Sequence, residues 1–308
     1  EMVGNVVNVL QGKVFPARIR WRDGRITSVG PVRGSEADGK PFFMPGFVDA
    51  HVHVESSMLP PLEFARMASV HGTLASVSDP HEIANVCGIE GVDFMLEEGA
   101  RSPLHFCFGA PSCVPATPHE TSGAVLNAGE VEALLERPAI GYLAEVMDYP
   151  GVLAGEPDLM AKIRAAQRLG KPVDGHSPGL RGASLAAYAA AGISTDHESS
   201  TLEEAREKCS VGMKILIREG SAARNFAALL PLIGERPMDC MFCSDDKHPD
   251  ALLAGHINQL AARAVDAGFP LFDVLRAACV NPVRHYRLPD GFLRPGDPAD
   301  FIAVSDLK

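Results

Sequence analysis

The chain has 308 residues, 46% of them hydrophobic and 22% charged, which is typical of a globular protein with a sizeable core. Its formal net charge of −11 argues against nucleic acid or an anionic membrane as the main partner, because both require a basic face. No apolar run approaches the ~20 residues of a membrane-spanning helix, and the first residues do not resemble a signal peptide. The seven cysteines are irregularly spaced, so we expect no disulfide framework and a cytoplasmic location.

The two ends of the chain predict a small β unit. Three β-like runs between residues 6 and 29 are separated by glycine-containing turns, which is typical of hairpins. Residues 290–304 return to the same turn-then-strand character. We therefore expect 1–44 and 286–308 to form one accessory domain, a small β-sandwich built from both chain ends.

Residues 45–285 alternate short apolar runs with segments of helical spacing, which indicates a parallel α/β sheet. Eight apolar runs lie near 47–53, 73–79, 104–110, 139–146, 172–176, 193–197, 213–218 and 240–245. Eight strand–helix units over about 230 residues fit a (β/α)8 TIM-like barrel. A doubly wound open sheet would show the same alternation, but the glycine-rich phosphate turn expected after its first strand is missing.

The first apolar run ends with two histidines. Pro45-Gly46 forms a turn, and His51 and His53 lie two residues apart on the strand that follows, so their side chains project to one face. Two imidazoles on one face at the end of a strand can hold one divalent metal ion. A single His-x-His pair is weak evidence, so the ends of the other runs decide the interpretation.

Catalytic residues of a barrel enzyme lie at the C-terminal ends of the strands. Metal-ligating residue types close the first, fourth, fifth, sixth and eighth runs, namely His51, His53, Glu145, His176, His197 and Asp245. We infer a two-metal site, in which His51 and His53 hold one ion. His176 and His197 hold the second ion, and Glu145 bridges the two.

Asp245, at the end of the eighth run, is expected to contact a metal and to hydrogen-bond the water between the ions. Two cations ~3.5–4 Å apart lower the pKa of a bridging water toward neutrality. Asp245 would accept the proton of that water and then pass it to a leaving group. Four imidazoles and two carboxylates without a thiolate suit two divalent ions per chain, of Mn, Fe or Zn, better than they suit a structural zinc site with soft ligands.

Other interpretations of the same residues exist. Glu145 could be an ion-pair partner in the core, and His176 and His197 could be ordinary core histidines. Asp245-Asp246 could cap a helix. His53-Val54-Glu55 with Cys240 and Cys243 is similar to the signature of zinc nucleotide deaminases, but the cysteines lie inside an apolar run, so we expect them in the core.

The chain resembles the adenine deaminases of the amidohydrolase superfamily in an ordered set of motifs. Pro-Gly-Phe-Val-Asp-Ala-His-Val-His marks only the superfamily, whereas the Glu-Ser-Ser that follows it is more specific. Ser-Asp-Pro-His-Glu and Ile-Arg-Glu-Gly-Ser are equally specific. The full set lies at 45–58, 78–86, 111–117, 143–152, 174–180, 196–199, 217–222 and 243–250.

The resemblance implies a (β/α)8 barrel that hydrolyses adenine to hypoxanthine and ammonia. It also implies a two-metal centre that holds Mn or Fe in preference to Zn. It supports Glu145 as the bridging ligand, where many superfamily relatives have a carboxylated lysine. Asp79 and His81 match a motif close to the metals and would relay protons or orient the purine, although His81 could be a plain loop residue. Further candidates for binding purine ring nitrogens are Glu55, Glu120 and Glu219.

We therefore expect a metal-dependent aminohydrolase in which hydroxide held between the metals attacks C6 of adenine. N6-methyladenine, another aminopurine or a cyclic amide is the alternative substrate, and an inactive metal-binding homologue is the alternative class. Family members usually continue into a further C-terminal domain after the segment matching 292–308, and we expect this chain to lack it. We also expect a homo-oligomer, with a dimer as the simplest case, and a small purine as its ligand.

Overall fold

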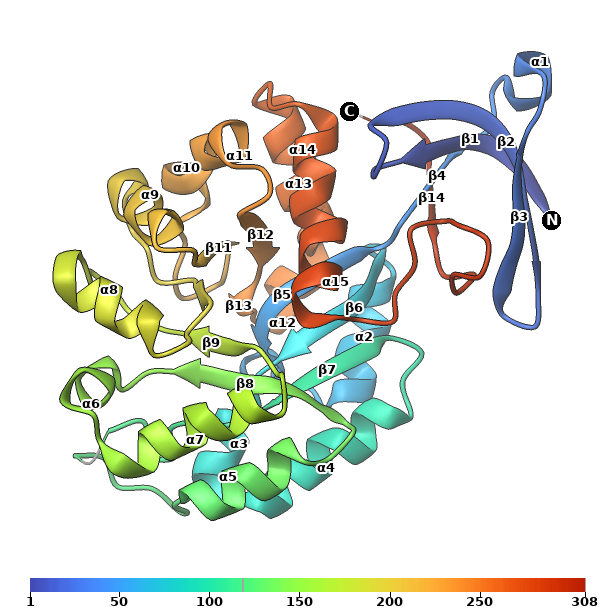
Figure 1. The fold of residues 1–308 in the computed structure, drawn as a ribbon. Helices are drawn as coiled ribbons and strands as arrows, with labels where there is room; N and C mark the ends of the chain where they lie inside the picture. Colours follow the sequence, from blue (N-terminus) through green and yellow to red (C-terminus); the bar gives the residue numbers. More distant parts are fainter. Residues whose placement is uncertain (118, 308) are drawn as a thin grey trace.

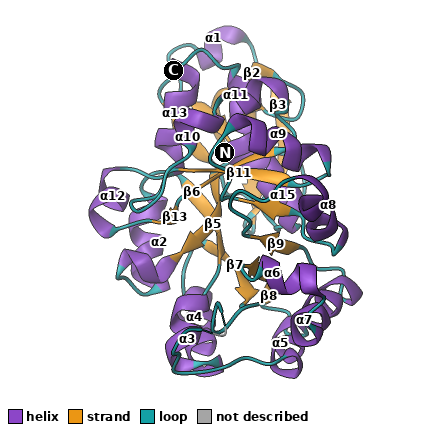
Figure 2. Cartoon of the chain, turned by 90° about the vertical axis from the view of Figure 1, so that its left-hand side faces the viewer, coloured by secondary structure: helices purple, strands orange, loops and turns teal. Residues whose placement is uncertain are grey.

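The computed structural model describes residues 1–117 and 119–307; Lys308, the last residue of the predicted C-terminal segment, lies outside these ranges. A five-stranded sheet formed by the two ends of the chain lies beside a larger region of strands and helices (Figure 1). In the larger region, helices surround a central set of strands (Figure 2). None of the described helices is both long and apolar enough to cross a membrane.

The five-stranded sheet has the strand order β14-β4-β1-β2-β3. Its strands are β1 (Met2–Asn8), β2 (Lys13–Arg22), β3 (Arg25–Pro31), β4 (Phe42–Met44) and β14 (Ile302–Val304), with the short helix α1 (Gly34–Ala37) before β4. Asp23 and Gly24 both have positive φ, which gives the tight turn between β2 and β3. β14 pairs antiparallel with β4, so the two chain ends share one sheet as predicted. A sandwich requires two facing sheets, and it stays a prediction.

Every predicted apolar run from 47 to 245 contains a strand. These strands are β5 (Phe47–His53), β6 (Thr73–Ser78), β7 (His105–Ala110), β8 (Ile140–Val146), β9 (Val173–Gly175), β10 (Thr195–Asp196), β11 (Lys214–Arg218) and β12 (Cys240–Cys243), which β13 (Asp245–Asp246) continues. The paired neighbours among them are parallel. Ser194 N–H donates to Val173 O between β9 and β10, and β13 pairs with β5, so the curved sheets form a TIM-like barrel.

Helices cover the outside of this barrel (Figure 2). They are η1 (Val54–Ser57), α2 (Pro61–Ser69), α3 (His81–Cys87), α4 (Ile89–Ala100), α5 (Ala128–Leu135), α6 (Tyr149–Ala154), α7 (Pro157–Arg168), α8 (Gly182–Ala190), α9 (Leu202–Ser210), α10 (Phe226–Leu229), α11 (Pro231–Glu235), α12 (Pro249–Ala254), α13 (Ile257–Asp266), α14 (Leu271–Leu275), η2 (Arg276–Val280) and α15 (Asn281–Tyr286). Their buried residues recur at helical spacing, as Leu159, Ile163 and Ala166 do in α7.

Side chains alternate along the barrel strands between the interior and the helix layer. In β11, Leu216 packs in the barrel interior, whereas Ile215 and Ile217 pack in the cluster that includes α10 and α13. Cys240 and Cys243 are buried free cysteines on β12, and because they are three residues apart they pack in different clusters. The prediction that these cysteines belong to the core is confirmed.

Candidate metal centre

The six predicted metal ligands lie together at the C-terminal ends of the barrel strands. His51 and His53 end β5, Glu145 lies near the end of β8, and Asp245 begins β13. His176 and His197 directly follow β9 and β10. All except the half-buried His176 are buried, so the cluster is a compact polar site at one end of the barrel.

A local irregularity in β5 brings its two histidines into the site. Val48 and Ala50 pack in the barrel interior, and the pairing of β5 with β6 shifts register between Asp49 and Val52. After such a bulge, residues of the opposite parity can face the same side. The rings of His51 and His53 converge, with their Nε2 atoms 3.2 Å apart.

Glu145 lies between two pairs of histidines. Its Oε1 is 3.2 Å from His53 Nε2 and 3.9 Å from His51 Nε2. Its Oε2 is 2.6 Å from His176 Nδ1 and 3.3 Å from His197 Nε2. Each carboxylate oxygen therefore faces a different histidine pair, which is the arrangement that a bridging carboxylate needs.

Asp245 approaches the same cluster from β13 with a backbone φ of 54°. Its Oδ1 lies 3.4 Å from His51 Nε2 and 3.3 Å from His53 Nε2. The guanidinium of Arg218 donates to Asp245 Oδ2 at 2.7 Å and also binds Glu198. One oxygen of Asp245 is thus directed at the histidines, and the other is held by a cation.

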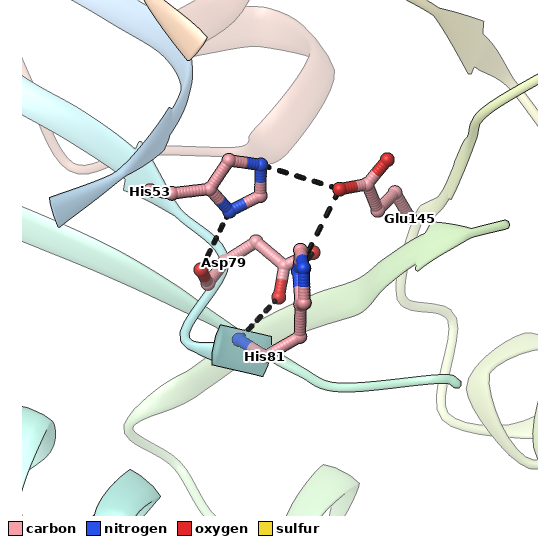
Figure 3. Close-up of side chains that lie close together, drawn as sticks. All are labelled: His53, Asp79, His81 and Glu145. Carbon is pink, nitrogen blue, oxygen red and sulfur yellow. Dashed lines mark hydrogen bonds and ion pairs between the residues drawn. The ribbon is translucent and has the colours of Figure 1, made fainter. Parts of the chain in front are cut away.

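Asp79 and His81 also lie beside the cluster (Figure 3). His53 Nδ1 lies 3.1 Å from Asp79 O, and the His81 backbone N–H donates to Asp79 Oδ1 at 3.0 Å. His81, the first residue of α3, has its Nδ1 3.2 Å from Asp79 Oδ2 and 3.6 Å from Glu145 Oε1. The His81 side chain therefore points toward the metal-ligand candidates.

The charges of the cluster are mutually stabilised. Burial alone would raise the pKa of Glu145, but the neighbouring histidines, His197 foremost, hold it well below the usual range. Burial is likewise outweighed at Asp245, where hydrogen bonds from His51 and His53 lower the pKa of the carboxyl. Burial opposes protonation of His197, yet Glu145 raises its pKa to about 9. A metal ion that binds here displaces protons from such imidazoles.

The residues present fit divalent metal ions. Combinations of three or four of these residues and their neighbours have their ligand atoms within 4.8 Å of one another. The separation of 3.2 Å between His51 Nε2 and His53 Nε2 corresponds to an angle of about 100° at an ion ~2.1 Å from each. Imidazole and carboxylate donors without a thiolate are the ligands that Mn, Fe and Zn accept.

A cavity of about 290 Å³ opens onto this cluster. It is lined by His53, His81, Glu82, Glu145, Met147, His176, His197, Glu198, Arg218, Ala223, Asp245 and Asp246. The three glutamates predicted to bind a purine, Glu55, Glu120 and Glu219, are not in this lining. Their contribution to binding stays a prediction.

The contacts of two of these glutamates explain why they lie outside the cavity. Glu55 accepts a hydrogen bond from the backbone N–H of Ile83 in α3, and burial raises its pKa to about 7. Glu219 pairs with Arg263 of α13 at 2.9 Å. Glu120 is exposed in the loop before α5.

Sequence reasoning missed Arg218, Glu198, Glu82 and Asp246, all of which line the cavity. The signal for Arg218 was the alternation of β11. Leu216 faces the barrel interior, so Arg218 faces the same side and the next residue, Glu219, does not. Glu198 directly follows His197, and its carboxylate lies 3.4 Å from the His197 ring.

Comparison with known proteins gives one family and one fold. The model of the amidohydrolase family matches residues 42–308. A deacetylase for N-acetyl-D-glucosamine-6-phosphate from Mycobacterium smegmatis has a similar structure, with a TM-score of 0.69 at 17% identity over 98% of this chain and 95% of that one. A β-aspartyl dipeptidase from Fervidobacterium islandicum AW-1 gives 0.67 at 13% identity over 99% and 92%. At such identities these likenesses concern the fold alone.

Curated relatives are much more similar in sequence. A protein of Salinibacter ruber named adenine deaminase is 59% identical over 100% of this chain and 56% of its own length. A protein of the same name from Methanosarcina acetivorans is 55% identical, over 100% of this chain and 55% of its own length. The chain thus spans about half the length of the curated relatives that it matches.

Proposed function

Because the chain belongs to the amidohydrolase family, we propose that it catalyses the hydrolysis of adenine to hypoxanthine and ammonia. The observation that carries the proposal is Glu145, whose two carboxylate oxygens face two different histidine pairs while Asp245 lies beside one of them. The relatives named adenine deaminases, which match along the whole of this chain, supply the substrate.

We propose that two divalent ions, Mn or Fe in preference to Zn, bind in this cluster. His51 and His53 would hold one ion and His176 and His197 the other, with Glu145 between them. When bound, such ions lower the pKa of a shared water toward neutrality and so supply a nucleophile for C6 of adenine.

Asp245 would move the proton in this reaction. Because Arg218 donates to Oδ2, Oδ1, which faces His51 and His53, is the oxygen that would accept a proton from the water and then donate it to the departing amine. Asp79 and His81 are the proposed partners that orient the purine or relay this proton, since the His81 ring reaches toward Glu145.

The cavity lining can recognise a small neutral purine through hydrogen bonds. The carboxylates of Glu82 and Asp246 are acceptors for purine N–H groups. Ser56 Oγ lies 3.3 Å from Glu82 Oε1 and 2.6 Å from Asp246 Oδ1, and its single O–H donates to one of them at a time. Arg218 is a donor for a ring nitrogen or the developing oxygen at C6. Adenine carries both donors and acceptors on its edges, so this mixed lining suits it.

We further propose that residues 45–285 are the catalytic barrel and that 1–44 with 286–308 form the accessory domain. The sheet in which β14 pairs with β4 supports this division. The homo-oligomer and the cytoplasmic location stay predictions.

The test is ammonia release from adenine by the purified chain, loaded in turn with Mn, Fe and Zn and assayed for bound metal. We expect release with about two ions per chain. Two bound metals without release would contradict adenine as the substrate and direct the assay to N6-methyladenine, other aminopurines and cyclic amides.

Asp245→Asn tests the proton transfer separately. The variant should lose turnover while retaining most of the metal, because an amide cannot accept the proton. The control is Asp93→Asn on α4, which weakens a partly exposed ion pair between Asp93 and Arg137 and should leave turnover unchanged. An Asp245→Asn protein as active as the wild type would exclude Asp245 as the proton carrier.

A further inference from the structure

Asp49 is a fully buried carboxylate that lies outside the metal-ligand cluster. It precedes the register shift in β5, and its side chain contacts the end of β12 and the start of α13 rather than the cavity. A buried charge needs several hydrogen bonds, and the partners of Asp49 show what it holds.

Four groups surround the Asp49 carboxylate. The Ser244 backbone N–H donates to Oδ1 at 2.9 Å, and the Ser244 hydroxyl donates to Oδ2. His256 Nε2 lies 2.8 Å from Oδ2. The backbone N–H of His51 approaches Oδ1 at 3.4 Å. One carboxylate thus contacts the residue before Asp245 and the backbone of His51.

His256 is itself held from the other side of its ring. Its Nδ1 lies 2.7 Å from the hydroxyl of Thr73, the first residue of β6. If the Thr73 hydroxyl donates to Nδ1, the Nε2–H tautomer donates to Asp49, and both ring nitrogens of His256 have a partner. His256, Thr73 and Asp49 are all buried, so this hydrogen-bonded chain is shielded from water.

The conformation of Asp245 requires such a support. Its φ of 54° is in the left-handed region, which residues other than glycine adopt at an energetic cost and only where their surroundings hold them. Ser244, directly before it, is fixed at both its backbone N–H and its hydroxyl by Asp49. We propose that Asp49 and His256 are positioning residues, which through Ser244 hold Asp245 against His51 and His53.

The contacts distinguish this role from a simple contribution to the core. A core ion pair would stabilise the fold wherever its atoms lie, whereas Asp49 bonds the backbone next to one proposed ligand and the backbone of another. Partners that orient metal ligands typically change metal affinity or activity by about 10–100-fold when they are removed. The inference rests on the proposed metal centre and deepens it.

The test compares His256→Ala with His256→Gln. In the folded wild type and in each folded variant we measure kcat and KM for adenine. Separately, we measure the rate at which bound Zn²⁺ is lost to a chromogenic chelator. We expect His256→Ala to lower kcat by about 10–100-fold with a KM nearly unchanged, and to accelerate Zn²⁺ loss by a similar factor. His256→Gln, whose amide can still donate to Asp49, should recover most of both losses.

His105→Gln is the matched control, because His105 also faces a carboxylate, Asp290, at 3.0 Å, but on the opposite side of the barrel from the cluster. It should leave kcat and Zn²⁺ loss unchanged. Ser244→Ala and Asp49→Asn provide the same comparison if His256→Ala does not fold, and we expect faster Zn²⁺ loss from both.

The Zn²⁺ readout separates the two proposals. If the wild type binds Zn²⁺ but releases no ammonia, the proposed activity fails, while faster Zn²⁺ loss from His256→Ala with recovery in His256→Gln still supports the positioning role. If folded His256→Ala matches the wild type within twofold in Zn²⁺ loss and in kcat, the positioning role is overturned.

Discussion

The two sides of the candidate metal centre rest on different supports. On the β5–β13 side, a single carboxylate, Asp49, is paired with a histidine ring. On the β9–β10 side, the loops that carry His176 and His197 are held by a buried cluster of two carboxylates and one lysine, Asp196, Glu204 and Lys208. Both supports are buried, but only the second depends on a full ion pair within the barrel wall.

The difference follows from the local backbone. β10 has two residues, and the segments after β9 and β10 are irregular, so their N–H groups need acceptors that a longer strand would supply. Asp196 accepts from the backbone of Ser177 and Ser199, and Glu204 accepts from that of Gly179 and Ser200. Two buried carboxylates need a nearby positive charge, and the ammonium group of Lys208 supplies it.

The largest expected effect comes from removing that compensation. Lys208 Nζ lies 2.8 Å from both Asp196 and Glu204 and also donates to Ser177 O. Lys208→Met should reduce the free energy of unfolding by about 3–5 kcal/mol, because both carboxylates are left buried without their cation. Urea denaturation monitored by circular dichroism measures the loss.

Arg181→Met is the control for Lys208→Met. It removes an exposed ion pair between Arg181, which directly precedes α8, and Glu207 of α9, the helix that carries Lys208. Its effect on stability should be small. Equal losses in the two variants would mean that the Lys208 cluster is no more important to stability than a surface pair, and the comparison of the two supports would fail.

A smaller effect concerns two histidines outside the metal-ligand cluster. His256 faces a carboxylate, whereas His285 of α15 faces the hydroxyl of Ser194 at 3.3 Å. Burial, with the positive charges of Lys214 and Arg287, lowers the pKa of His285 to about 4. The folded state therefore binds this proton less readily than the unfolded state, whose histidine pKa is ~6.5.

The lowered pKa of His285 contributes to the free energy of unfolding, and this contribution is complete above pH ~6.5. It is lost as the pH falls from there toward 4, and the loss between pH 7 and pH 5 is about 2 kcal/mol. His285→Gln should reduce the pH dependence of the free energy of unfolding by that amount. Urea denaturation at pH 7 and pH 5 measures the free energy of unfolding of both proteins. An equal change between the two pH values in His285→Gln and in the wild type would contradict the lowered pKa.

Most of the fold could be predicted because the barrel strands are short, apolar and almost wholly buried. β5 is buried at all seven of its residues. Such a strand is encoded by a short run rich in apolar residues, which can be recognised without any contact information. The residues that close the runs were recognisable for a related reason, since parallel strands bring their C-terminal ends together. The pairing of the two chain ends in one sheet followed from their shared turn-then-strand character.

Other features could not be predicted because they depend on long-range contacts. The partners Asp49 and His256 are 207 residues apart, and nothing local to either indicates the other. The register shift in β5 sends Asp49 toward α13 while His51 faces the site, and a strict alternation would have placed both on one face. Arg218 was recognisable in principle by parity with Leu216, but the motif drew attention to Glu219 instead.

The smallest effect concerns a residue outside both supports. Asn127 caps α5, accepting from the backbone N–H groups of Gly129 and Glu130 at 3.0 and 3.1 Å, and the Glu130 side chain accepts from Asn127 N–H in return. Asn127→Ala should cost about 1 kcal/mol of stability without changing Zn²⁺ loss or kcat.

Asn127→Ala is therefore a control for the effect of lower stability on the rate of Zn²⁺ loss. If Asn127→Ala accelerated Zn²⁺ loss as much as His256→Ala, the rate of metal loss would report general stability alone. If only the variants at Asp49, Ser244 and His256 accelerate it, the β5–β13 support acts on the metal centre itself. Stability measured alongside metal loss in each variant therefore separates a residue that holds the fold from one that holds Asp245.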